Sequence, residues 1–552
     1  MAACGVPTAQ PPASAPVVAH SQAQVASSVE VAPPPVAPTC ATDIPKAACA
    51  KWHGHGELSL CAPSNATAGK WRYALVAPLY SPFQNIAAEK LSSLWTGGTM
   101  SAASETATVL ATQLGSGKTV ESIDVRAGHW ALVPVDELDP RWSVITIANK
   151  HPLREDTALT VGLCGDGPAV TNLDPDEVTT LAMTGVTAMA RFTAKLMDKK
   201  GVTYPARDVA SWFEKTDYVH ISNEVSFVPD CKIPEDRDDV QPFCSRESYI
   251  GLMEAMHANL VELDGSHLTD WGYSQFRHTI EMYEQRGWHF FGGGRDQIEA
   301  TKPLLLDDKA GTKLALIGCN MPHSTGHWVH ATPDVGYCDL ARIEWQIADL
   351  KQRGYTPIVS IQHEEVYSHR PPDSLVVDFR RMAAAGAAVV FGSQAHWAHP
   401  FEMRDGTYIH YGAGNFFFDQ AWAEAQDATN DRFYFAHGKL LTVEHLFTRL
   451  EETGRPRPMH DGERAEFLKK LDDEREKLPT FKTKKKAPTT REATIPDSFI
   501  IGREPILISI ALGDTTKVTL RHATPLKWKR VKPAIVDYVA TKYGIARDTI
   551  KL

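Results

Sequence analysis

The sequence predicts an α/β fold: a layered α/β sandwich with a smaller N-terminal α/β domain before it and a C-terminal extension after it. Between residues 176 and 455, short apolar runs alternate with segments whose apolar residues recur every three or four positions. This pattern is typical of strands that alternate with amphipathic helices in a layered core. Two further apolar runs, at 71–78 and 129–134, precede it. Because 552 residues exceed what one ordinary core can hold, we expect two or three domains.

The composition excludes some classes of protein. Hydrophobic residues make up 43% and charged residues 22% of the chain, as in globular proteins. A net charge of −10 over this length is mild, so we expect no nucleic-acid partner. No apolar run reaches the length of about 18 residues that a membrane-spanning helix needs.

The first 66 residues are expected to form a disordered tether. They are rich in proline, alanine and valine, and such a stretch buries too little apolar area to offset the entropy of the chain. Residues 1–5 read Met-Ala-Ala-Cys-Gly, which resembles the end of a bacterial lipobox. We therefore expect Cys4 to carry a lipid that holds the protein to a membrane, on the outer face of a bacterial cell envelope. The alternative is a chance cysteine beside a disordered start.

Cysteine spacing predicts disulfides and export. Nine cysteines less a lipidated Cys4 leave eight, an even number that can pair completely. We predict two bonds that each close a short loop, Cys231–Cys244 and Cys319–Cys338. No Cys-x-x-Cys occurs, which argues against zinc held by thiolates. Paired cysteines indicate an oxidising, exported location, and buried free thiols are the alternative.

Residues 67–175 are expected to form the smaller N-terminal domain. The runs at 71–78 and 129–134 predict strands, and the segment 89–95 predicts a short helix that ends before Gly97. We assign no ligand to this domain.

Residues 176–455 are expected to form the central α/β domain. Its strands are predicted from apolar runs at 180–184, 218–221, 259–263, 314–318, 357–361 and 388–391. Its helices are predicted from one apolar face around 189–196 and at 273–286, 340–350 and 375–385. Asp339 is a plausible N-cap for the third helix, and Gly386 ends the fourth.

Residues 456–552 are expected to form a charged linker and a small C-terminal unit. The segment 463–477 predicts a highly charged helix, and the basic run 482–486 is typical of a solvated linker. Apolar runs at 506–510 and 518–520 predict two strands.

Polar side chains follow four of the predicted strands directly. In α/β sheets, ligands bind at the edge where the strands have their carboxyl ends, so we expect these side chains to surround one site. The four groups are Asn223 with Glu224, Ser266 with His267, Gln362 with His363, and Gln394 with His396.

A stretch near the end of the central domain resembles a known family. Residues 392–397 read Gly-Ser-Gln-Ala-His-Trp, and residues 414–419 read Gly-Asn-Phe-Phe-Phe-Asp. With the segment 401–411 between them, they are similar to the closing motif of the CapA family of capsule and poly-γ-glutamate synthesis proteins. The resemblance covers about residues 178–450 and implies a metallophosphatase-like fold. It also implies a role in the biosynthesis or anchoring of an anionic envelope polymer, and a small-molecule substrate is the alternative partner.

The resemblance implies metal ligands that this chain has changed. The family's first motif is a strand that ends Gly-Asp, but residues 185–187 read Gly-Val-Thr and supply no carboxylate. Ser266 stands where the family has an asparagine ligand, and Gln362 and Gln394 stand where it has histidines. Amides bind transition metals weakly, so a two-metal phosphatase centre is disfavoured. A single divalent ion, Mn, Fe or Zn, is the alternative.

The strand positions and the resemblance together supply the candidate site residues. Thr187 is expected beside them, where the family's aspartate would sit. The catalytic candidates are His267, Asp270 and Glu224. The substrate-binding candidates are Asn223, Gln362, Gln394 and Asn415. The candidate ligands of a single metal are His396, His267, Glu224 and, if its strand has already ended, His363.

Three functions stay open at this point. The first is a CapA-like envelope protein of polymer biosynthesis. The second is a degenerate hydrolase of a phosphoester or amide, in which carboxylates such as Glu365 assist histidine bases. The third is a binding module that kept the fold without catalysis. Gly-x-Ser-x-Gly, P-loop and His-Glu-x-x-His motifs are absent from the sequence.

Overall fold

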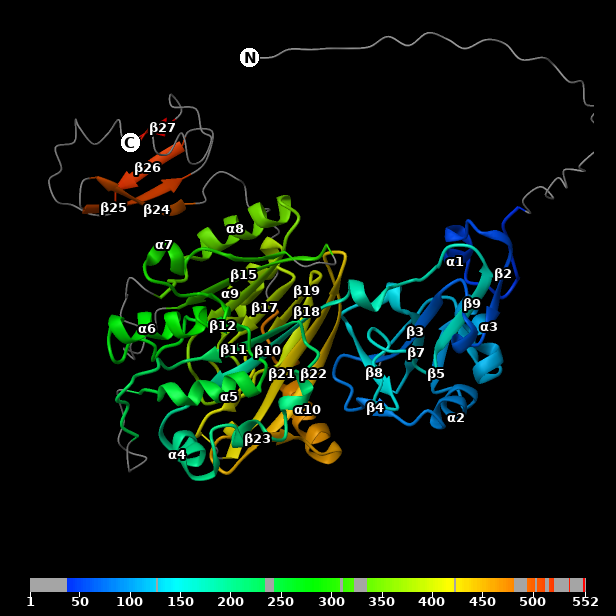
Figure 1. Cartoon of the computed structure of the whole chain (residues 1–552), viewed down its shortest axis with the longest axis horizontal. Coiled ribbons are helices and arrows are strands. Elements are labelled where there is room, and N and C mark those ends of the chain that lie inside the picture. The colour runs from blue at the N-terminus through cyan, green and yellow to red at the C-terminus, as the bar shows by residue number, and fades with distance from the viewer. Residues whose placement is uncertain are drawn as a thin grey trace, which may run out of the picture.

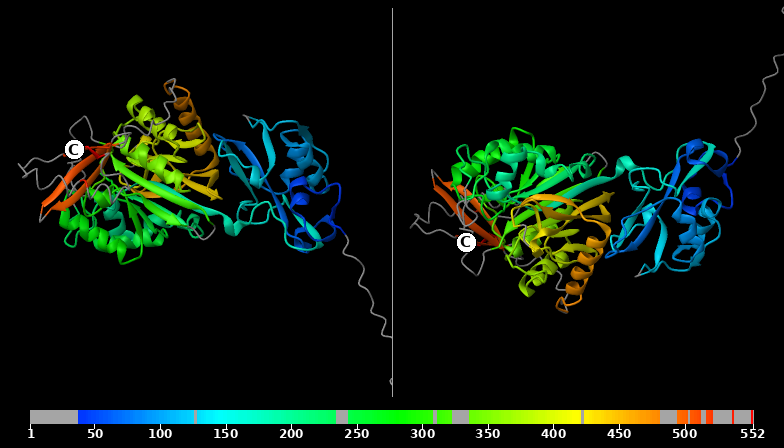
Figure 2. Two further views of the ribbon diagram at one scale, coloured as in Figure 1. Left: turned by 90° about the horizontal axis from the view of Figure 1, so that it is seen from above. Right: turned by 90° about the horizontal axis from the view of Figure 1, so that it is seen from below.

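The computed structural model describes most of the chain as two adjoining domains and a small C-terminal sheet (Figure 1). The N-terminal domain lies at one end of the central domain, and the small sheet lies at the other (Figure 2). The residues described are 37–125, 128–233, 243–307, 311–321, 335–420, 423–480, 494–501, 504–511, 516–520, 536 and 550–551.

The N-terminal domain is built on one sheet of nine described strands. Their order is β1-β2-β9-β3-β7-β5-β6, and β8 pairs with both β3 and β4. The strands are β1 (Thr39–Cys40), β2 (His55–Cys61), β3 (Lys70–Pro78), β4 (Asn85–Ile86), β5 (Met100–Ala103), β6 (Lys118–Val120), β7 (Trp130–Pro134), β8 (Trp142–Ile147) and β9 (Thr160–Asp166). The helices are α1 (Lys46–Lys51), α2 (Lys90–Thr96) and α3 (Ser104–Leu114). The predicted strands at 71–78 and 129–134 and the helix at 89–95 are confirmed.

The predicted tether is wrong for its later part, because residues 39–61 contain β1, α1 and β2. Disulfides Cys40–Cys49 and Cys61–Cys164 hold β1, α1 and β2 to the rest of the sheet. Trp52 and Leu58 are buried in the same core as Trp71. Composition alone predicted disorder because it does not account for disulfides. Two disulfides restrict the unfolded chain here and so stabilise a segment that buries little apolar area. The earlier part of the tether, including Cys4, lies outside the described residues.

The central domain contains two sheets. The first has the order β13-β12-β11-β10-β21-β22-β23, with β20 beside β10, and β10 to β13 run parallel. Its strands are β10 (Thr179–Thr187), β11 (Tyr218–Asn223), β12 (Leu260–Glu262), β13 (His289–Phe291), β20 (Asn415–Phe417), β21 (Asp427–Ala436), β22 (Lys439–Glu451) and β23 (Arg455–Pro458). The second has the order β14-β15-β16-β17-β19-β18. Its strands are β14 (Leu304–Asp307), β15 (Lys313–Asn320), β16 (Thr356–Gln362), β17 (Val389–Gly392), β18 (Phe401–Arg404) and β19 (Thr407–His410).

The two sheets pack face to face between two layers of helices. Met183 of β10, Leu316 of β15 and Phe391 of β17 share the buried cluster between the sheets. Helices α4, α5 and α6 cover the outer face of the first sheet, and α8 and α9 cover that of the second. The helices are α4 (Arg191–Lys200), α5 (Ile250–Ala255), α6 (Tyr273–Glu284), α7 (Gln297–Ala300), α8 (Leu340–Gln352), α9 (Asp373–Ala385) and α10 (Asp461–Arg475). The chain therefore forms the predicted layered α/β sandwich.

Short 3₁₀ turns complete the connections between these elements. They are η1 (Pro63–Asn65), η2 (Val135–Glu137), η3 (Pro175–Glu177), η4 (Tyr204–Ala206), η5 (Ala210–Trp212), η6 (Glu247–Tyr249) and η7 (Ala423–Gln426). Local sequence sets the helix ends as predicted. The Asp339 side chain accepts a hydrogen bond from the backbone of Arg342 and caps α8, and Gly386 ends α9 with a φ of 101°.

The expected boundary at residue 455 cuts through the central domain. Strand β23 pairs with β22, and α10 buries Phe467, Leu468 and Leu471 in the core between the sheets. The charged helix predicted at 463–477 is therefore part of this domain, because one of its faces is apolar. A separate sheet follows, with strands β24 (Thr494–Ile501), β25 (Glu504–Ala511), β26 (Thr516–Leu520) and β27 (Ile550–Lys551). The basic run 482–486 lies outside the described residues.

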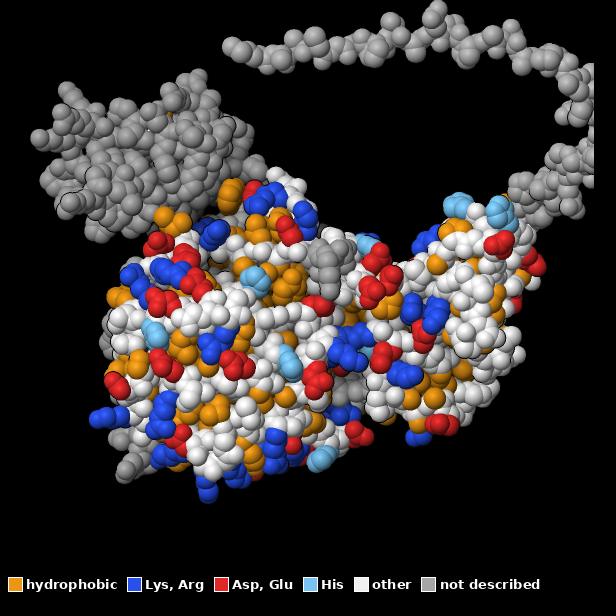
Figure 3. Space-filling view, viewed as in Figure 1, with side chains coloured by type: hydrophobic (Ala, Val, Ile, Leu, Met, Phe, Trp, Pro, Cys, Tyr) orange, Lys and Arg blue, Asp and Glu red, His pale blue; other side chains and the backbone are white. Residues whose placement is uncertain are grey.

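All eight cysteines beyond Cys4 are paired. The predicted bonds Cys231–Cys244 and Cys319–Cys338 are confirmed, beside the two bonds of the N-terminal domain. Four disulfides indicate that the chain resides in an oxidising compartment outside the cytosol. Among the described residues, no helix combines the length and apolar character needed to cross a membrane. On the face shown in Figure 3, acidic and basic side chains are interspersed.

Candidate functional site

The carboxyl ends of strands from both central sheets meet at one edge of the domain. Two serines of the second sheet bridge to the first. Ser360 of β16 donates a hydrogen bond to Glu262 of β12 at 2.8 Å, and Ser393, which follows β17, donates to the same carboxylate at 2.5 Å. The loops that follow β10, β11, β12, β16 and β17 therefore surround one region, as strand ends of an α/β sheet do.

Glu224 follows β11 and is the most unusual group of this region. Its backbone N–H donates to the carbonyl of Thr187 at 2.9 Å, which fixes the residue beside the end of β10. The side chain is 1% exposed, yet neither carboxylate oxygen has a hydrogen-bond partner in the described part of the chain. Burial raises the pKa of Glu224 to about 7, which His396 opposes and Glu365 reinforces. A carboxyl group with this pKa can donate or accept a proton near neutrality.

His396 lies close to Glu224 and is held by Asn415. Its Nδ1 is 2.7 Å from Oδ1 of Asn415, whose amide nitrogen donates to the carbonyl of Ala425 at 3.2 Å. Because the amide group is oriented by that second bond, Oδ1 accepts and Nδ1 carries the proton. The other ring nitrogen, Nε2, is 3.6 Å from a carboxylate oxygen of Glu365. The structure thus makes Asn415 a positioning residue for His396.

His267 and Asp270 form a second carboxylate–histidine pair. Nδ1 of His267 is 2.9 Å from Oδ2 of Asp270, and the same oxygen accepts the backbone N–H of Phe243 at 2.9 Å. Val225, next to Glu224, forms a β-bridge with His267, which brings this pair to the end of β11. A carboxylate that fixes Nδ1 leaves Nε2 to exchange protons with a substrate.

Arg191 is a site residue that sequence reasoning missed. It begins α4 with a φ of 45°, a left-handed conformation that is strained for a residue with a side chain. Its guanidinium is ion-paired with Asp419 and lies 4.5 Å from the ring of Phe243 and 5.6 Å from that of Phe418. This positive charge also opposes the raised pKa of Glu224. A pairing across 228 positions has no local sequence signal.

The two glutamines and Thr187 lie at the ends of their strands with unsatisfied polar atoms. Gln362 is the last residue of β16, and both polar atoms of its buried amide lack a partner among the described residues. Oε1 of Gln394 and Oγ1 of Thr187 are likewise buried without partners there. Buried polar groups are rarely left unsatisfied, so this set is typical of a ligand site.

Two predicted site residues, Asn223 and His363, have hydrogen-bond partners outside the site. The amide nitrogen of Asn223 donates to the carbonyl of Val225 and to the hydroxyl of Tyr283 on α6, both at 2.8 Å. His363 is 3.2 Å from Asp378 and packs against Phe379, both on α9. These contacts place His363 on the outer face of the second sheet, because it follows Gln362 and adjacent residues point to opposite faces. His363 as a metal ligand does not fit the structure, whereas Oδ1 of Asn223 is buried without a partner among the described residues, as are the polar atoms of Gln362.

Among the described residues, no group of three or more histidine, cysteine, aspartate or glutamate side chains could hold an ion. Nδ1 of His396 is bonded to Asn415, and Nδ1 of His267 is bonded to Asp270, which leaves Nε2 of each ring as the nitrogen that could bind a metal. Both carboxylate oxygens of Glu224 lack a partner among the described residues.

A second buried network lies directly beneath the site, and sequence reasoning missed it as well. Glu262 binds His220 Nε2 at 2.9 Å and both bridging serines. Asp264, two residues on, is buried beside it, and burial with the neighbouring Glu262 charge raises its pKa well above the ordinary value. The signal was available: a glutamate inside the apolar run 259–263 is unusual in a buried strand.

The segment that holds this site matches a known protein family and two of its named relatives. A model of the family described as "Bacterial capsule synthesis protein PGA_cap" matches residues 180–420. The PGA biosynthesis protein CapA of Bacillus subtilis (strain 168) is 25% identical over 256 residues, which are 46% of this chain and 67% of that protein. The capsule biosynthesis protein CapA of Bacillus anthracis is 21% identical over 294 residues, 51% of this chain and 70% of that protein.

Solved structures give weaker likenesses. NAD nucleotidase (NadN) of Haemophilus influenzae aligns over 54% of this chain and 56% of its own, with 11% identity and a TM-score of 0.29. A 5'-nucleotidase precursor of Thermus thermophilus aligns over 53% of this chain and 58% of its own, with 13% identity and a TM-score of 0.31. At these scores neither alignment bears on the site. The two packed sheets and their helices confirm the predicted layered α/β sandwich.

Proposed function

We propose that this chain acts in the biosynthesis of a capsule polymer of the poly-γ-glutamate type, because residues 180–420 of its central domain match the bacterial capsule synthesis protein family. Two relatives that match this domain carry the names PGA biosynthesis protein CapA and capsule biosynthesis protein CapA. The observation that carries the proposal is positional. Glu224, His267, Asp270, His396 and Asn415 all lie inside the matched segment, around one sheet edge.

The proposed chemistry is acid–base work on an amide bond of the polymer. Glu224 titrates near neutrality because it is buried, so it can protonate a leaving nitrogen or deprotonate an attacking group. His267, oriented by Asp270, supplies a second base. His396, oriented by Asn415 through Nδ1, presents Nε2 beside Glu365. This chemistry needs only proton transfer by these side chains.

The proposed place of action is the cell envelope. The four disulfides support export to an oxidising compartment. Lipid attachment at Cys4 belongs to this proposal, and that residue lies outside the described ones. Labelling with a radioactive fatty acid should mark the full chain and not a Cys4→Ser variant. If the Cys4→Ser variant is labelled as strongly as the wild type, Cys4 does not carry the lipid.

A genetic experiment tests the proposed role directly. Deleting the gene from the organism that carries it should abolish surface polymer, measured as released glutamate after acid hydrolysis. The wild-type chain should restore it, and so should Glu281→Gln, a matched change on the exposed face of α6. Normal polymer in the deletion strain would overturn the proposal.

Substitutions in the same strain separate catalysis from binding. Glu224→Gln and His267→Ala should each lower polymer by at least about tenfold, because loss of a positioned acid or base costs a factor of roughly 100 or more. If both variants restore polymer as well as the wild type, the site does not act as an acid–base catalyst, and the chain serves as a binding module. Equal protein levels on immunoblots make the comparison valid.

A further inference from the structure

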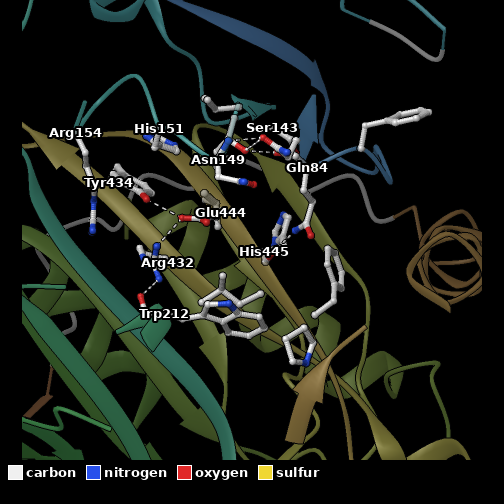
Figure 4. A pocket seen from close by; sticks show the side chains of 18 of the residues that line it. Gln84, Ser143, Asn149, His151, Arg154, Trp212, Arg432, Tyr434, Glu444 and His445 are labelled. Atoms are coloured by element: carbon white, nitrogen blue, oxygen red, sulfur yellow. Dashed lines mark hydrogen bonds and ion pairs between the residues drawn. The ribbon is translucent and has the colours of Figure 1, made fainter. Parts of the chain in front are cut away.

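A cavity lies at the interface between the N-terminal and central domains. Its volume is about 600 Å³, and none of the candidate-site residues lines it. The wall on one side comes from β8 and the loop that follows it, and on the other side from β21 and β22 (Figure 4). Clefts between domains are common ligand sites.

Fixed contacts hold these two walls together. Ala74 and Val133 of the N-terminal domain share a buried cluster with Tyr434 and Leu441 of the central domain. Gln84 donates to the carbonyl of His445 at 2.5 Å across the interface. The cavity is therefore a built feature of the fold, with walls set by apolar packing and a hydrogen bond.

Arg432 contributes a buried cation to the cavity. Its side chain is 7% exposed, and Nη1 is paired with Glu444 at 2.9 Å, while Nη2 donates to the carbonyl of Trp212. Its third donor, Nε, has no partner among the residues that the structure describes. An unpaired buried N–H of a guanidinium costs free energy unless an acceptor reaches it.

His151 adds a second unsatisfied donor. Its ring lies parallel to that of Tyr434, with centroids 4.4 Å apart, and it is 7% exposed. The backbone N–H of Leu153 donates to Nδ1 at 3.3 Å, so the proton of the neutral ring is on Nε2. Burial lowers the pKa of His151 to about 4, which keeps the ring neutral. Nε2 has no partner in the described ranges.

Arg154 completes the group beside the same ring. Its guanidinium carbon lies 5.3 Å from the centroid of Tyr434, and the structure describes no hydrogen-bond partner for its buried Nη2. Figure 4 shows Arg154, His151 and Arg432 around Tyr434. Three unsatisfied nitrogen donors thus gather about one aromatic ring.

The acidic residues of the cavity do not cancel this arrangement. Glu444 already accepts from Arg432 and from the hydroxyl of Tyr434 at 2.6 Å. Glu155 and Glu214 line the cavity too, but both lie at its rim, as does Lys215. The inner wall therefore offers donors, and the rim carries mixed charge that solvent screens.

We propose that this cavity binds a carboxylate-bearing ligand of amino-acid or short-peptide size, with its carboxylate on Arg154, Nε of Arg432 and Nε2–H of His151. Guanidinium groups bind carboxylates strongly because charge assists each hydrogen bond. This site goes beyond the proposed function: it is separate from Glu224 and stands whether or not the sheet edge is catalytic. Free glutamate, a γ-glutamyl oligomer and the intact polymer all present this chemistry.

Isothermal titration calorimetry on the full chain tests the proposal and identifies the source of the carboxylate. Glutamate, a γ-linked glutamate trimer and poly-γ-glutamate are titrated separately, with inorganic phosphate as the other anion. At least one carboxylate should bind with one site per chain. Binding of phosphate alone, or of none of these probes, overturns the proposal.

Variants locate the binding. Arg154→Ala should weaken it roughly tenfold to a hundredfold, the cost of one hydrogen bond to a charged group. Arg353→Ala is the matched control: it removes the same charge from an exposed position at the end of the distant helix α8 and should change nothing. Asn149→Asp places a negative charge on an exposed turn of the cavity with a φ of 63° and should also weaken binding. Affinity unchanged in both Arg154→Ala and Asn149→Asp overturns the site.

One further variant separates this proposal from the proposed function. Glu224→Gln should bind the carboxylate probe as the wild type does, because Glu224 does not line this cavity. If Glu224→Gln abolishes binding while Arg154→Ala does not, the probe occupies the sheet edge and the cavity between the domains is not the site.

Discussion

Two glutamates lie at the ends of neighbouring strands, Glu224 after β11 and Glu262 in β12. They are equally buried, but they differ in their hydrogen-bond partners and in the direction of their pKa shifts. Each is 1% exposed. Glu262 is surrounded by the imidazole of His220 and the hydroxyls of Ser360 and Ser393. Burial raises its pKa, but those hydrogen bonds outweigh burial, and the pKa lies below the ordinary value. Glu224 has no such partners in the described chain, and burial raises its pKa to about 7.

The difference shows that partners, and not depth, decide the charge of a buried carboxyl group. Glu262 is held as an anion and joins the two sheets through their serines. Glu224 is left without donors at an edge where His267, His396 and Arg191 also lie, an arrangement that stability alone does not favour. Groups with pKa values shifted toward neutrality are typical of functional sites. The two glutamates therefore show a structural carboxylate and a chemically available one at neighbouring strands of one sheet.

Replacing the structural carboxylate should have the largest effect on stability. Glu262→Gln removes the anion that His220, Ser360 and Ser393 share and should lower the free energy of unfolding by about 3 kcal/mol or more, as when a buried ionic network loses one partner. Urea denaturation at pH 7 measures this. The exposed change Glu281→Gln should have an effect near zero. A loss in Glu262→Gln as small as in that control would mean that the network does not hold the sheets.

Removing a single donor from the same network should cost less. Ser393→Ala deletes one hydrogen bond to a charged group and should lower the free energy of unfolding by about 1.5–3 kcal/mol. The surface change Ser211→Ala is the control and should be neutral. Stability equal to the wild type would show that the Ser393–Glu262 contact contributes nothing and that Glu262 resembles Glu224 more than we infer.

Changing a neighbour of Glu224 should have the smallest effect, a shift in pH dependence. Glu365 raises the pKa of Glu224 through like charge, so Glu365→Gln should lower that pKa by less than about one unit for a partly exposed neighbour. His396 acts in the opposite direction, so His396→Ala should raise it. The midpoint of the pH dependence of the melting temperature reports both. Shifts of the same sign in both variants would contradict this electrostatic account.

Much of the fold could be predicted from the sequence because local patterns determine it. Apolar runs gave β10, β11, β15 and β16 within a few residues, and capping by Asp339 and the glycine at 386 gave the ends of α8 and α9. Polar residues after those strands located the sheet edge. The Pro/Ala-rich start misled because the Cys40–Cys49 and Cys61–Cys164 bonds lie outside any local pattern.

The candidate site was harder, since its decisive contacts are not local. The orientation of His363 depended on where β16 ends, and the strand continues to Gln362. The Arg191–Asp419 pair and the serines that reach Glu262 join residues more than 90 positions apart. The cavity between the domains could not be foreseen either, because Arg154 and Arg432 come from different domains and meet at Tyr434.

The pH dependence of stability in Glu224→Gln, against the wild type, tests the central claim most directly. Glu224 has a folded pKa of about 7 against 4.5 for an ordinary glutamate, so between these values the folded wild type holds a proton that the unfolded chain releases. Wild-type stability from this group should therefore fall as pH rises from 4.5 to 7, by about 3 kcal/mol, while the glutamine variant does not titrate. Urea denaturation should show that the free energy of unfolding of the variant increases relative to that of the wild type as pH rises to 7, and that this difference is constant above pH 7. A difference that is constant with pH, or that favours the wild type as pH rises, would contradict the account.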